Sequence, residues 1–582
     1  MRFRSFSALG AAVLALSLAA SAAGPSQAVA PAAKNATGGS SITPDELKEW
    51  LSYIASDQLQ GRQVYSEGLG LAAAYIVDHL KEWGVKPGGD DGTYFQVVKV
   101  LGVTTKSNSS VTVTVNGQSR TFKDGEGITF PRNQGVKQTI SGSVEFVGNG
   151  LTVPEVKQDD YKGRDVSGKI VVFLGRGPEG VPFRALASRG RTAIELQHAI
   201  ATIGPAGNFP GQQGRGQPGT PAPQGGGGGR AGQTLGDFQT VQRLDNKIPA
   251  QITASDEFYE FLFSAAGKKY TDLKALADKQ QPLPAVALDG VSMTINVDAS
   301  YDVVQTRLTH NVVGVVEGSD PQVKDTYVMF GAHYDHIGYL QFAPAAGRGG
   351  FGGGGTAPGG CTGQTRDTPR NGDIINNGAD DDGSGTVALM SLAKAFALGP
   401  KPKRSLMFVW HAGEEAGLLG SRYMADYPEV PLDKVAAQLN IDMIGRNRCD
   451  DPSESNTVYL VGADRISTEL HNLNEDANAS LAPPMKLNYE LNDPTDPESI
   501  YTRSDHYSYA SKGIPIIFYT TGLHRDYHYV TDEVSKIEFP KLAHITQLVY
   551  ATGWKVANLD HFPARDNKGP RKGKGASGKI GS

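Results

Sequence analysis

The 582-residue chain of 61.7 kDa is long enough for several domains, which excludes a small scaffold held together by disulfides. Its 56 basic and 61 acidic residues nearly balance, so no strong positive field favours nucleic acid or an anionic membrane as a partner. Glycine is in excess, with 72 residues against a usual share of roughly 7%. The excess lies mainly in two tracts, 204–232 and 347–372, and neither keeps the Gly-X-Y period of collagen.

Residues 1–22 have the pattern of a cleavable signal peptide. Arg2 and Arg4 precede an apolar run from Ala8 to Ala20, and Ala20-Ser21-Ala22 fits a small-residue cleavage site. A transmembrane anchor is the alternative, but the run is short for a bilayer span, and no cysteine near the cleavage site offers a lipid attachment point. We therefore expect a secreted or periplasmic protein with no stable membrane anchor.

The first ordered elements are expected to be helices. A leader over 23–42, rich in Ala, Pro, Gly and Ser, should be flexible. Thr43-Pro44-Asp45-Glu46 then combines an N-cap, a proline at the first helical position and a capping-box glutamate, and apolar residues follow at helical spacing up to Ile54. A second helix is predicted from about Leu69 to Trp83, with Gly84 as its C-cap.

The rest of the chain divides into a β-rich part and an alternating part. From about 131 to 300, runs such as 143–147 and 169–174 are typical of short strands, and the first glycine tract interrupts them. After 300, short apolar runs alternate with helical stretches, which predicts an α/β fold with a mixed, mostly parallel sheet and helices on both faces, plus an inserted mainly-β domain. The predicted strands are Tyr327–Phe330, Leu406–Trp410, Ala437–Ile441, Val458–Val461 and Ile514–Tyr519, and the predicted helices include Thr386–Leu398 and Phe539–Val556. We expect a disordered tail over 561–582.

Acidic and histidine residues gather at the ends of these predicted strands. In open α/β sheets, ligands converge at the carboxyl ends of the strands. Several carboxylates this close would repel one another and take up protons unless cations were bound, and nitrogen and oxygen donors without thiolates suit Zn²⁺ in an open, catalytic site. Each group alone is common on protein surfaces, so the prediction depends on their joint occurrence in order. The groups are His333-Tyr334-Asp335-His336, Asp380-Asp381-Asp382, Glu414-Glu415, Asp442 and His528.

This ordered set resembles the M28 zinc peptidases, a family of bacterial secreted aminopeptidases and glutamate carboxypeptidase relatives with two co-catalytic zinc ions. The resemblance covers about 43–130 and 300–560 and implies the zinc exopeptidase fold, with a catalytic part over 301–560 that contains a Gly-rich insert at 341–372. The matching segments are His333-Tyr334-Asp335, Asp381 with Ser384-Gly385, Glu414 to Ser421, Asn440 to Met443, and Tyr527-His528.

The resemblance implies a role for eight side chains. Asp381 would bridge two Zn²⁺ ions, with an unusual peptide geometry at Asp381–Asp382, and Glu414 would be the general base that takes a proton from the bridging water. Asp335 would orient His333, and Tyr527 would hydrogen-bond the developing oxyanion, although a packed aromatic ring is the alternative for Tyr527. The five metal ligands would be His333 and Asp442 for one ion, Glu415 and His528 for the other, and Asp381 for both.

Two further segments have patterns of functional interest. Ser504-Asp505-His506 contains the residue types of a catalytic triad, but three adjacent residues cannot point at one another, so we expect them to line or support the pocket. Residues 131–300 resemble a protease-associated (PA) domain through 168–173 and 248–250, which would shape substrate access.

The two cysteines, Cys361 and Cys449, flank the predicted chemistry. They could be free buried thiols, but an exported protein permits a disulfide. Cys361 lies in the insert between His333 and Asp381, and Cys449 follows Asp442 by seven residues. Our hypothesis is a disulfide that tethers the insert to the rim of the site, which could contribute roughly 4 kcal/mol in the chain-entropy model.

The sequence thus favours a secreted binuclear zinc exopeptidase that acts on peptides, most simply an aminopeptidase. The alternatives are a zinc carboxypeptidase or dipeptidase on the same core, a glutaminyl cyclase relative with one zinc, and a receptor-like binding protein that has lost catalysis. The sequence carries no signal for the oligomeric state.

Overall fold

The computed structural model describes residues 38–206, 236–340, 361, 364, 366–370, 372–496, 498–571 and 578–581. The expected signal peptide, most of the leader and most of both glycine tracts lie outside these residues. None of the helices in the described ranges is long and apolar enough to cross a membrane.

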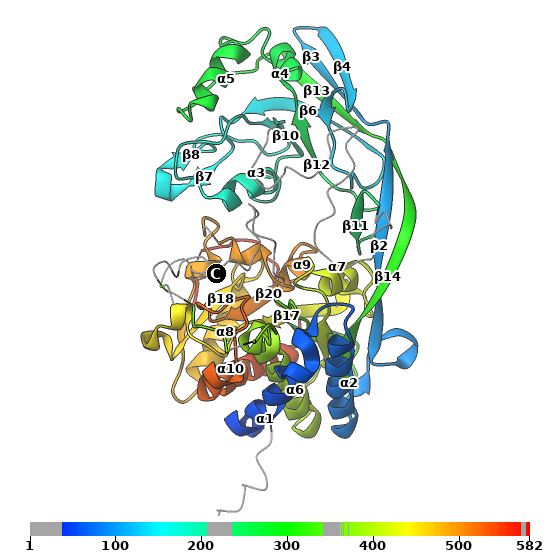
Figure 1. The fold of residues 1–582 in the computed structure, drawn as a ribbon, viewed down its shortest axis with the longest axis vertical. Coiled ribbons are helices and arrows are strands. Elements are labelled where there is room, and N and C mark those ends of the chain that lie inside the picture. Colours follow the sequence, from blue (N-terminus) through cyan, green and yellow to red (C-terminus); the bar gives the residue numbers. More distant parts are fainter. Residues whose placement is uncertain are drawn as a thin grey trace, which may run out of the picture. The chain divides into compact units, whose positions relative to one another are not determined.

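A ten-stranded mixed sheet has the strand order β11-β2-β14-β16-β15-β17-β20-β18-β19, with β1 beside β14 (Figure 1). Strands β1, β2 and β11 come from the first half of the chain and the other seven from the second half. Parallel pairing covers β16, β15, β17 and β20 in the centre and recurs between β18 and β19, while the other pairs are antiparallel. The mixed sheet is therefore as predicted, but "mostly parallel" holds only for its centre. The strands are β1 (Lys86–Pro87), β2 (Phe95–Ser107), β11 (Phe238–Thr240), β14 (Ala299–Val316), β15 (Tyr327–His333), β16 (Ser405–His411), β17 (Val435–Ile441), β18 (Thr457–Val461), β19 (Lys486–Asn488) and β20 (Ile516–Thr520).

Helices cover both faces of this sheet, as predicted. Phe330 and Phe408 point into a core shared with α1, α2, α6, α8 and α10, whereas their neighbours Met329 and Met407 point into a second core with α7 and α9. This alternation is the period of two expected for strands buried on both faces. The helices are α1 (Pro44–Ile54), α2 (Glu67–Glu82), α6 (Gly385–Leu398), α7 (Leu419–Asp426), α8 (Thr468–Ala479), α9 (His506–Ala510) and α10 (Phe539–Ala557).

The mainly-β insert is a closed eight-stranded barrel in the order β10-β12-β5-β4-β3-β13-β6-β9, with its own hydrophobic core. Its first strand starts at Ser110, earlier than the expected boundary at 131, because Val111, Val113 and Val115 alternate with polar residues and bury their side chains in the barrel. The strands are β3 (Ser110–Val115), β4 (Gln118–Asp124), β5 (Gly127–Thr129), β6 (Gln138–Phe146), β9 (Ile170–Val172), β10 (Ala201–Pro205), β12 (Ala250–Ala254) and β13 (Val291–Val297), with a hairpin of β7 (Thr152–Val153) and β8 (Gln158–Asp159) and the helices α3 (Phe183–Glu195), α4 (Asp256–Leu262) and α5 (Tyr270–Asp278).

Both ends of the described chain are more ordered than expected. Residues 38–41 form a helical turn, and Gly38 lies so close to Tyr550 that an added Cβ would be 2.7 Å from the tyrosine hydroxyl. In the tail, Asp566 accepts hydrogen bonds from the backbone N–H and the hydroxyl of Thr468 at the start of α8. The described part of the tail therefore caps a helix, which a low-complexity sequence does not reveal.

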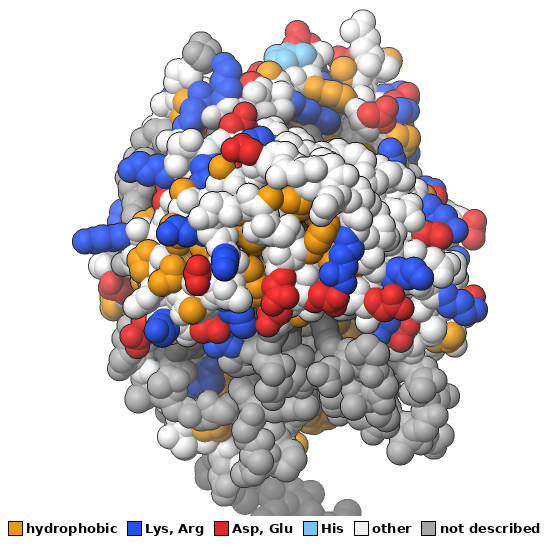
Figure 2. Space-filling view, turned by 90° about the horizontal axis from the view of Figure 1, so that it is seen from above, with side chains coloured by type: hydrophobic (Ala, Val, Ile, Leu, Met, Phe, Trp, Pro, Cys, Tyr) orange, Lys and Arg blue, Asp and Glu red, His pale blue; other side chains and the backbone are white. Residues whose placement is uncertain are grey.

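The surface carries charges of both signs. Figure 2 shows one face on which Lys and Arg side chains are interspersed with Asp and Glu, in keeping with the near-balanced composition.

Candidate metal centre

Four strand ends meet at one edge of the sheet and carry four of the five predicted ligands. β15 ends on His333, and Asp442 follows the last residue of β17. Glu415 comes four residues after the end of β16, and His528 eight residues after the end of β20. Because these four strands are parallel neighbours, their carboxyl ends bring the side chains together.

The fifth predicted ligand, Asp381, lies between the other four. Its Oδ1 is 3.3 Å from His333 Nε2, and its Oδ2 is 3.0 Å from His528 Nε2. Asp442 Oδ1 lies 3.6 Å from His333 Nε2, and Glu415 Oε2 lies 3.0 Å from His528 Nε2. The two oxygens of Asp381 therefore face two separate groups of atoms that could bind a metal ion.

Asp381 is held in place by backbone hydrogen bonds to its neighbours. The peptide bond between Asp381 and Asp382 is cis, which is the unusual geometry that the resemblance implied. Asp382 accepts hydrogen bonds from the backbone N–H groups of His333 and Met443, one at each carboxylate oxygen. Asp532 Oδ2 accepts one from the N–H of Asp381. The loop before α6 is thereby fixed to the ends of β15 and β17.

Burial and neighbouring charges shift the pKa values of this cluster. Burial alone would raise the pKa of Asp381, but His333 and His528 hold it well below its usual range. Burial would likewise raise the pKa of Glu415, which the charge of His528 lowers to about 2. For His333, burial would lower the pKa, but the Asp442 carboxylate raises it well above the usual value. Asp381 and Glu415 are thus held as anions, the form that binds a cation.

Glu414 lies beside this cluster and lines the same pocket as Asp381 and Asp442. Burial raises the pKa of Glu414 well above its usual range. Its backbone N–H donates a hydrogen bond of 3.1 Å to Asp335 Oδ1. A carboxylate with a raised pKa beside the predicted metal ligands can accept and release a proton, as general-base catalysis requires.

Asp335 and Tyr527 flank the cluster. Nδ1 of His333 lies 3.1 Å from the backbone carbonyl oxygen of Asp335 and 3.7 Å from its Oδ1, so the carbonyl is the closer partner of the imidazole. Tyr527 stacks on the ring of His528 at a centroid distance of 3.9 Å, and its hydroxyl accepts a 3.1 Å hydrogen bond from Arg503 Nη2. Burial raises the pKa of Tyr527 to about 12, which keeps the hydroxyl able to donate.

Ser504, Asp505 and His506 do not form a triad, as predicted. Ser504 Oγ donates a 2.6 Å hydrogen bond to Asp442 Oδ2, and Asp505 Oδ2 lies 3.3 Å from His411 Nδ1. His506 Nε2 instead donates to a backbone carbonyl oxygen 2.8 Å away. Ser504 lines the pocket, and the other two side chains are buried behind it.

The donor set fits divalent cations. The side chains of His333, Asp381 and Asp442 offer three donor atoms within 4.8 Å of one another, and so do those of His336, Asp381 and Glu415. Asp381 Oδ2 and Glu415 Oε1 are buried without hydrogen-bond partners, and such atoms are rare unless a ligand or ion satisfies them. Nitrogen and oxygen donors in this combination suit Zn²⁺.

Comparison with known proteins identifies this region. Residues 311–553 match the model of peptidase family M28. The match defines the M28 region, residues 311–553. Leucine aminopeptidase 2 of Arthroderma otae is 25% identical over 321 residues, which cover 51% of this chain and 54% of the relative. Aminopeptidase Y of Saccharomyces cerevisiae is 28% identical over 207 residues, or 33% of this chain and 36% of the relative. The chain thus spans about half, or less, of the length of these curated relatives.

Two solved structures are also similar to the chain. An aminopeptidase from Aneurinibacillus sp. strain AM-1 has 17% identity and a TM-score of 0.41, and the match covers 91% of this chain and 99% of that chain. A zinc aminopeptidase from Bacillus subtilis has 16% identity and a TM-score of 0.41, with 89% and 96% covered.

Two side chains of the M28 region contact the centre although the sequence assigned neither of them a role. His336 lies 2.9 Å from Glu415, and Arg503 contacts Tyr527 and lines the pocket. His336 lies three residues after His333, and Arg503 directly precedes Ser504. Closeness in the sequence to a predicted residue was therefore the signal that could have identified them.

The hypothesis of a disulfide is confirmed. Cys361 and Cys449 are bonded, with an S–S distance of 2.11 Å and a Cα–Cα distance of 5.2 Å. The backbone N–H of Cys449 donates to the carbonyl of Leu523, at the start of the loop that leads to Tyr527 and His528. The bond therefore joins the described end of the insert to the rim of the M28 centre.

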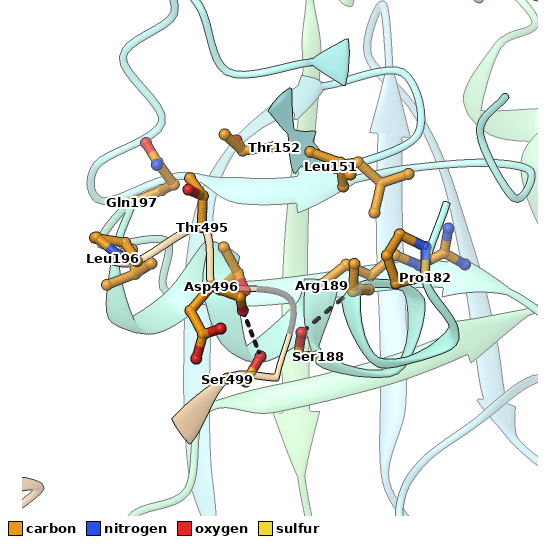
Figure 3. Close-up of a pocket in the computed structure, with 15 residues that line it drawn as sticks. Leu151, Thr152, Pro182, Ser188, Arg189, Leu196, Gln197, Thr495, Asp496 and Ser499 are labelled. Atoms are coloured by element: carbon orange, nitrogen blue, oxygen red, sulfur yellow. Dashed lines mark hydrogen bonds between the residues drawn. The ribbon is translucent and has the colours of Figure 1, made fainter. Parts of the chain in front are cut away.

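A second pocket lies between the barrel segment 150–197 and residues 494–499 of the M28 region (Figure 3). Its hydroxyl groups bond locally: Ser499 donates to the carbonyl of Asp496, and Ser188 to that of Ala185. Arg189 donates to backbone carbonyls of the barrel. Because these groups donate hydrogen bonds to backbone carbonyls nearby, we assign no catalytic or binding role to this pocket.

Proposed function

We propose that the chain is a binuclear zinc exopeptidase of family M28 that removes amino-terminal residues from peptides. The observation that carries this proposal is the arrangement around Asp381, whose two oxygens face two donor groups while Glu414 lines the same pocket. The family match supports peptide hydrolysis, and the relatives named aminopeptidase Y and leucine aminopeptidase 2 support the amino-terminal specificity.

The proposed ligands divide into two sets that share Asp381. His333 and Asp442 would complete one Zn²⁺ position, and Glu415 and His528 the other. When bound, the two ions polarise the scissile carbonyl and lower the pKa of a water molecule toward ~7.

The chain's own residues would handle the proton and the developing charge. Glu414 accepts a proton from the attacking water and delivers it to the leaving amine. The Tyr527 hydroxyl donates a hydrogen bond to the carbonyl oxygen of the substrate as negative charge forms there. Ser504 fixes the orientation of Asp442 through its 2.6 Å hydrogen bond.

The pocket beside Glu414 is suited to an apolar side chain of the substrate. Met443, Ile500, Phe518 and Leu523 line it. These groups offer contacts to carbon rather than hydrogen bonds, so we expect a preference for amino-terminal residues such as leucine.

The alternatives are less well supported. A carboxypeptidase or dipeptidase needs a cation for the terminal carboxylate, but Arg503 in this pocket is already hydrogen-bonded to Tyr527 and Glu498. A glutaminyl cyclase relative with one zinc would need only one of the two groups of metal ligands. A receptor that lost catalysis would lack the general base, whereas Glu414 is present.

The deciding experiment compares the zinc-loaded enzyme with Glu414→Gln on leucine anilide and on its N-acetylated form. The enzyme should cleave only the free amine, and the variant should bind two zinc ions while losing about 10²–10⁴-fold in kcat, because a general base typically contributes that much. Zinc content is measured on the same samples.

The matched control is Glu317→Gln. Glu317 follows β14 beside the start of β16, at the sheet edge opposite the centre, and its side chain is exposed. This variant should keep full activity. Full activity of Glu414→Gln with zinc bound, or cleavage of N-blocked substrates only, would overturn the proposal.

We further propose that the protein is exported and that the barrel is a PA domain that shapes substrate access. The disulfide supports an oxidising compartment. On the barrel, Glu195 of α3 accepts a hydrogen bond from the Tyr507 hydroxyl of α9, which supports a role beside the M28 region.

A further inference from the structure

His336 is a buried imidazole next to the centre and is not one of the five proposed metal ligands. It follows the end of β15 by three residues and is 1% exposed. Its backbone N–H donates to the carbonyl of Arg62, and an added Cβ at Gly378 would be 2.6 Å from two of its ring carbons. The ring is therefore held tightly in one place.

The ring nitrogens of His336 lack hydrogen-bond partners in the described part of the chain. Nδ1 lies 2.9 Å from Glu415 Oε1 and 3.9 Å from Asp381 Oδ2, and both of these oxygens also lack a hydrogen-bond partner. The side chains of His336, Asp381 and Glu415 offer ligand atoms that all lie within 4.8 Å of one another, as the ligands of one metal ion do.

The spacing of the donors agrees with that conclusion. Zn–N and Zn–O bonds of 2.0–2.2 Å put neighbouring ligand atoms of a tetrahedral site about 3.3–3.6 Å apart. The contacts of His336 Nδ1 and His528 Nε2 with the oxygens of Glu415 and Asp381 are 2.9, 3.9, 3.0 and 3.0 Å. The two imidazoles approach different oxygens of Glu415, which places that carboxylate between them.

We propose that His336 is a metal ligand, so that the Glu415 position takes two imidazole nitrogens while the Asp442 position takes one. This inference rests on the proposed function in that it assumes a metal at each position. The consequence is an unequal pair of sites. The nitrogen-rich position should prefer Zn²⁺, and the oxygen-rich position of His333, Asp381 and Asp442 should exchange more readily with Mn²⁺ or Co²⁺.

The first test replaces the side chain and measures zinc binding by competition with a chelator. His336→Gln places no donor at the Nδ1 position and should weaken one of the two zinc-binding steps by more than the roughly 10–100-fold that loss of an outer partner costs. His336→Asn, whose amide oxygen can take the place of Nδ1, should recover part of that affinity. The control is His471→Gln, which removes an equally buried imidazole from α8 and should leave both steps unchanged.

The second test needs no variant and so does not depend on how variants fold. X-ray absorption of the enzyme with two zinc ions should count three imidazoles for two ions, from His333, His336 and His528. A count of two, or unchanged zinc binding in folded His336→Gln, overturns the inference and leaves His336 as a support for Glu415. Both measurements report metal binding, so they remain decisive even if no peptide is hydrolysed, in which case only the proposed function fails.

Discussion

At the scale of single residues, Arg503 is the group that fixes the Tyr527 hydroxyl. Its Nη2 donates to that hydroxyl at 3.1 Å, and its Nη1 donates to Glu498 Oε2 at 3.2 Å. The guanidinium thus joins a carboxylate to the phenol. Since Tyr527 is proposed to donate to the substrate carbonyl, Arg503 acts as a positioning residue.

Arg503→Ala should lower kcat while leaving KM nearly unchanged. The expected loss is about tenfold, less than the 10²–10³-fold typical of deleting an oxyanion donor outright, because the tyrosine is still present. Arg503→Lys should recover part of kcat. In a Tyr527→Phe background, Arg503→Ala should cost little more, and an undiminished loss there would show that Arg503 does not act through Tyr527.

A residue of the centre could be predicted from the sequence where it lies at the end of a strand. His333 and Asp442 follow apolar runs that are strands, so the meeting of parallel strand ends was enough to bring them together. His336 was not assigned a role, because its orientation is set by the tight packing against Gly378, which lies far along the chain. The partner of His333 Nδ1 also differed, because a backbone carbonyl competes with the Asp335 carboxylate within two residues.

At the scale of elements, the loop after β20 is held from outside by the end of the insert. Arg366 donates to the backbone carbonyls of Arg525 and Tyr527, each at 3.2 Å, and Cys361 of the disulfide lies five residues before Arg366 in the chain. Contacts between positions separated by some 160 residues are not visible in a sequence pattern. The contact between the two cysteines was an exception, because a pair of cysteines by itself suggests a disulfide.

Replacing both cysteines by serine should loosen this loop and weaken catalysis. We expect faster hydrogen exchange at 522–529, lower affinity for one zinc ion and lower kcat, together with a loss of up to about 4 kcal/mol in the chain-entropy model. Arg366→Ala should reproduce the exchange and kcat effects with the disulfide intact, and Arg366→Lys should restore them in part. Unchanged exchange at 522–529 in both variants would show that the loop is held by other contacts, such as those of Asp526 with Arg446 and Lys536.

At the scale of the whole molecule, the barrel and the sheet have separate hydrophobic cores, and the metal centre belongs only to the sheet. The barrel core is formed by its own strands with α4 and α5, whereas the strands that end at the centre bury their side chains with α1, α2 and α6 to α10. The sequence indicated two differently patterned regions, but it did not predict barrel closure, because closure depends on pairing between strands as distant as β3 and β13.

Removing metal should therefore destabilise the sheet and spare the barrel. Without cations, the buried carboxylates of Asp381, Asp442 and Glu415 repel one another, whereas free zinc at a thousand times Kd stabilises the folded state by about 4 kcal/mol per site. Calorimetry should show one transition that shifts upward with zinc and one that does not, and hydrogen exchange should assign the shifting one to β15, β16, β17 and β20. His333→Ala should keep only part of the shift, while Glu317→Gln should behave as wild type. Equal effects of chelation on both transitions would mean that the two cores unfold together, because a ligand stabilises only the cooperative unit that binds it.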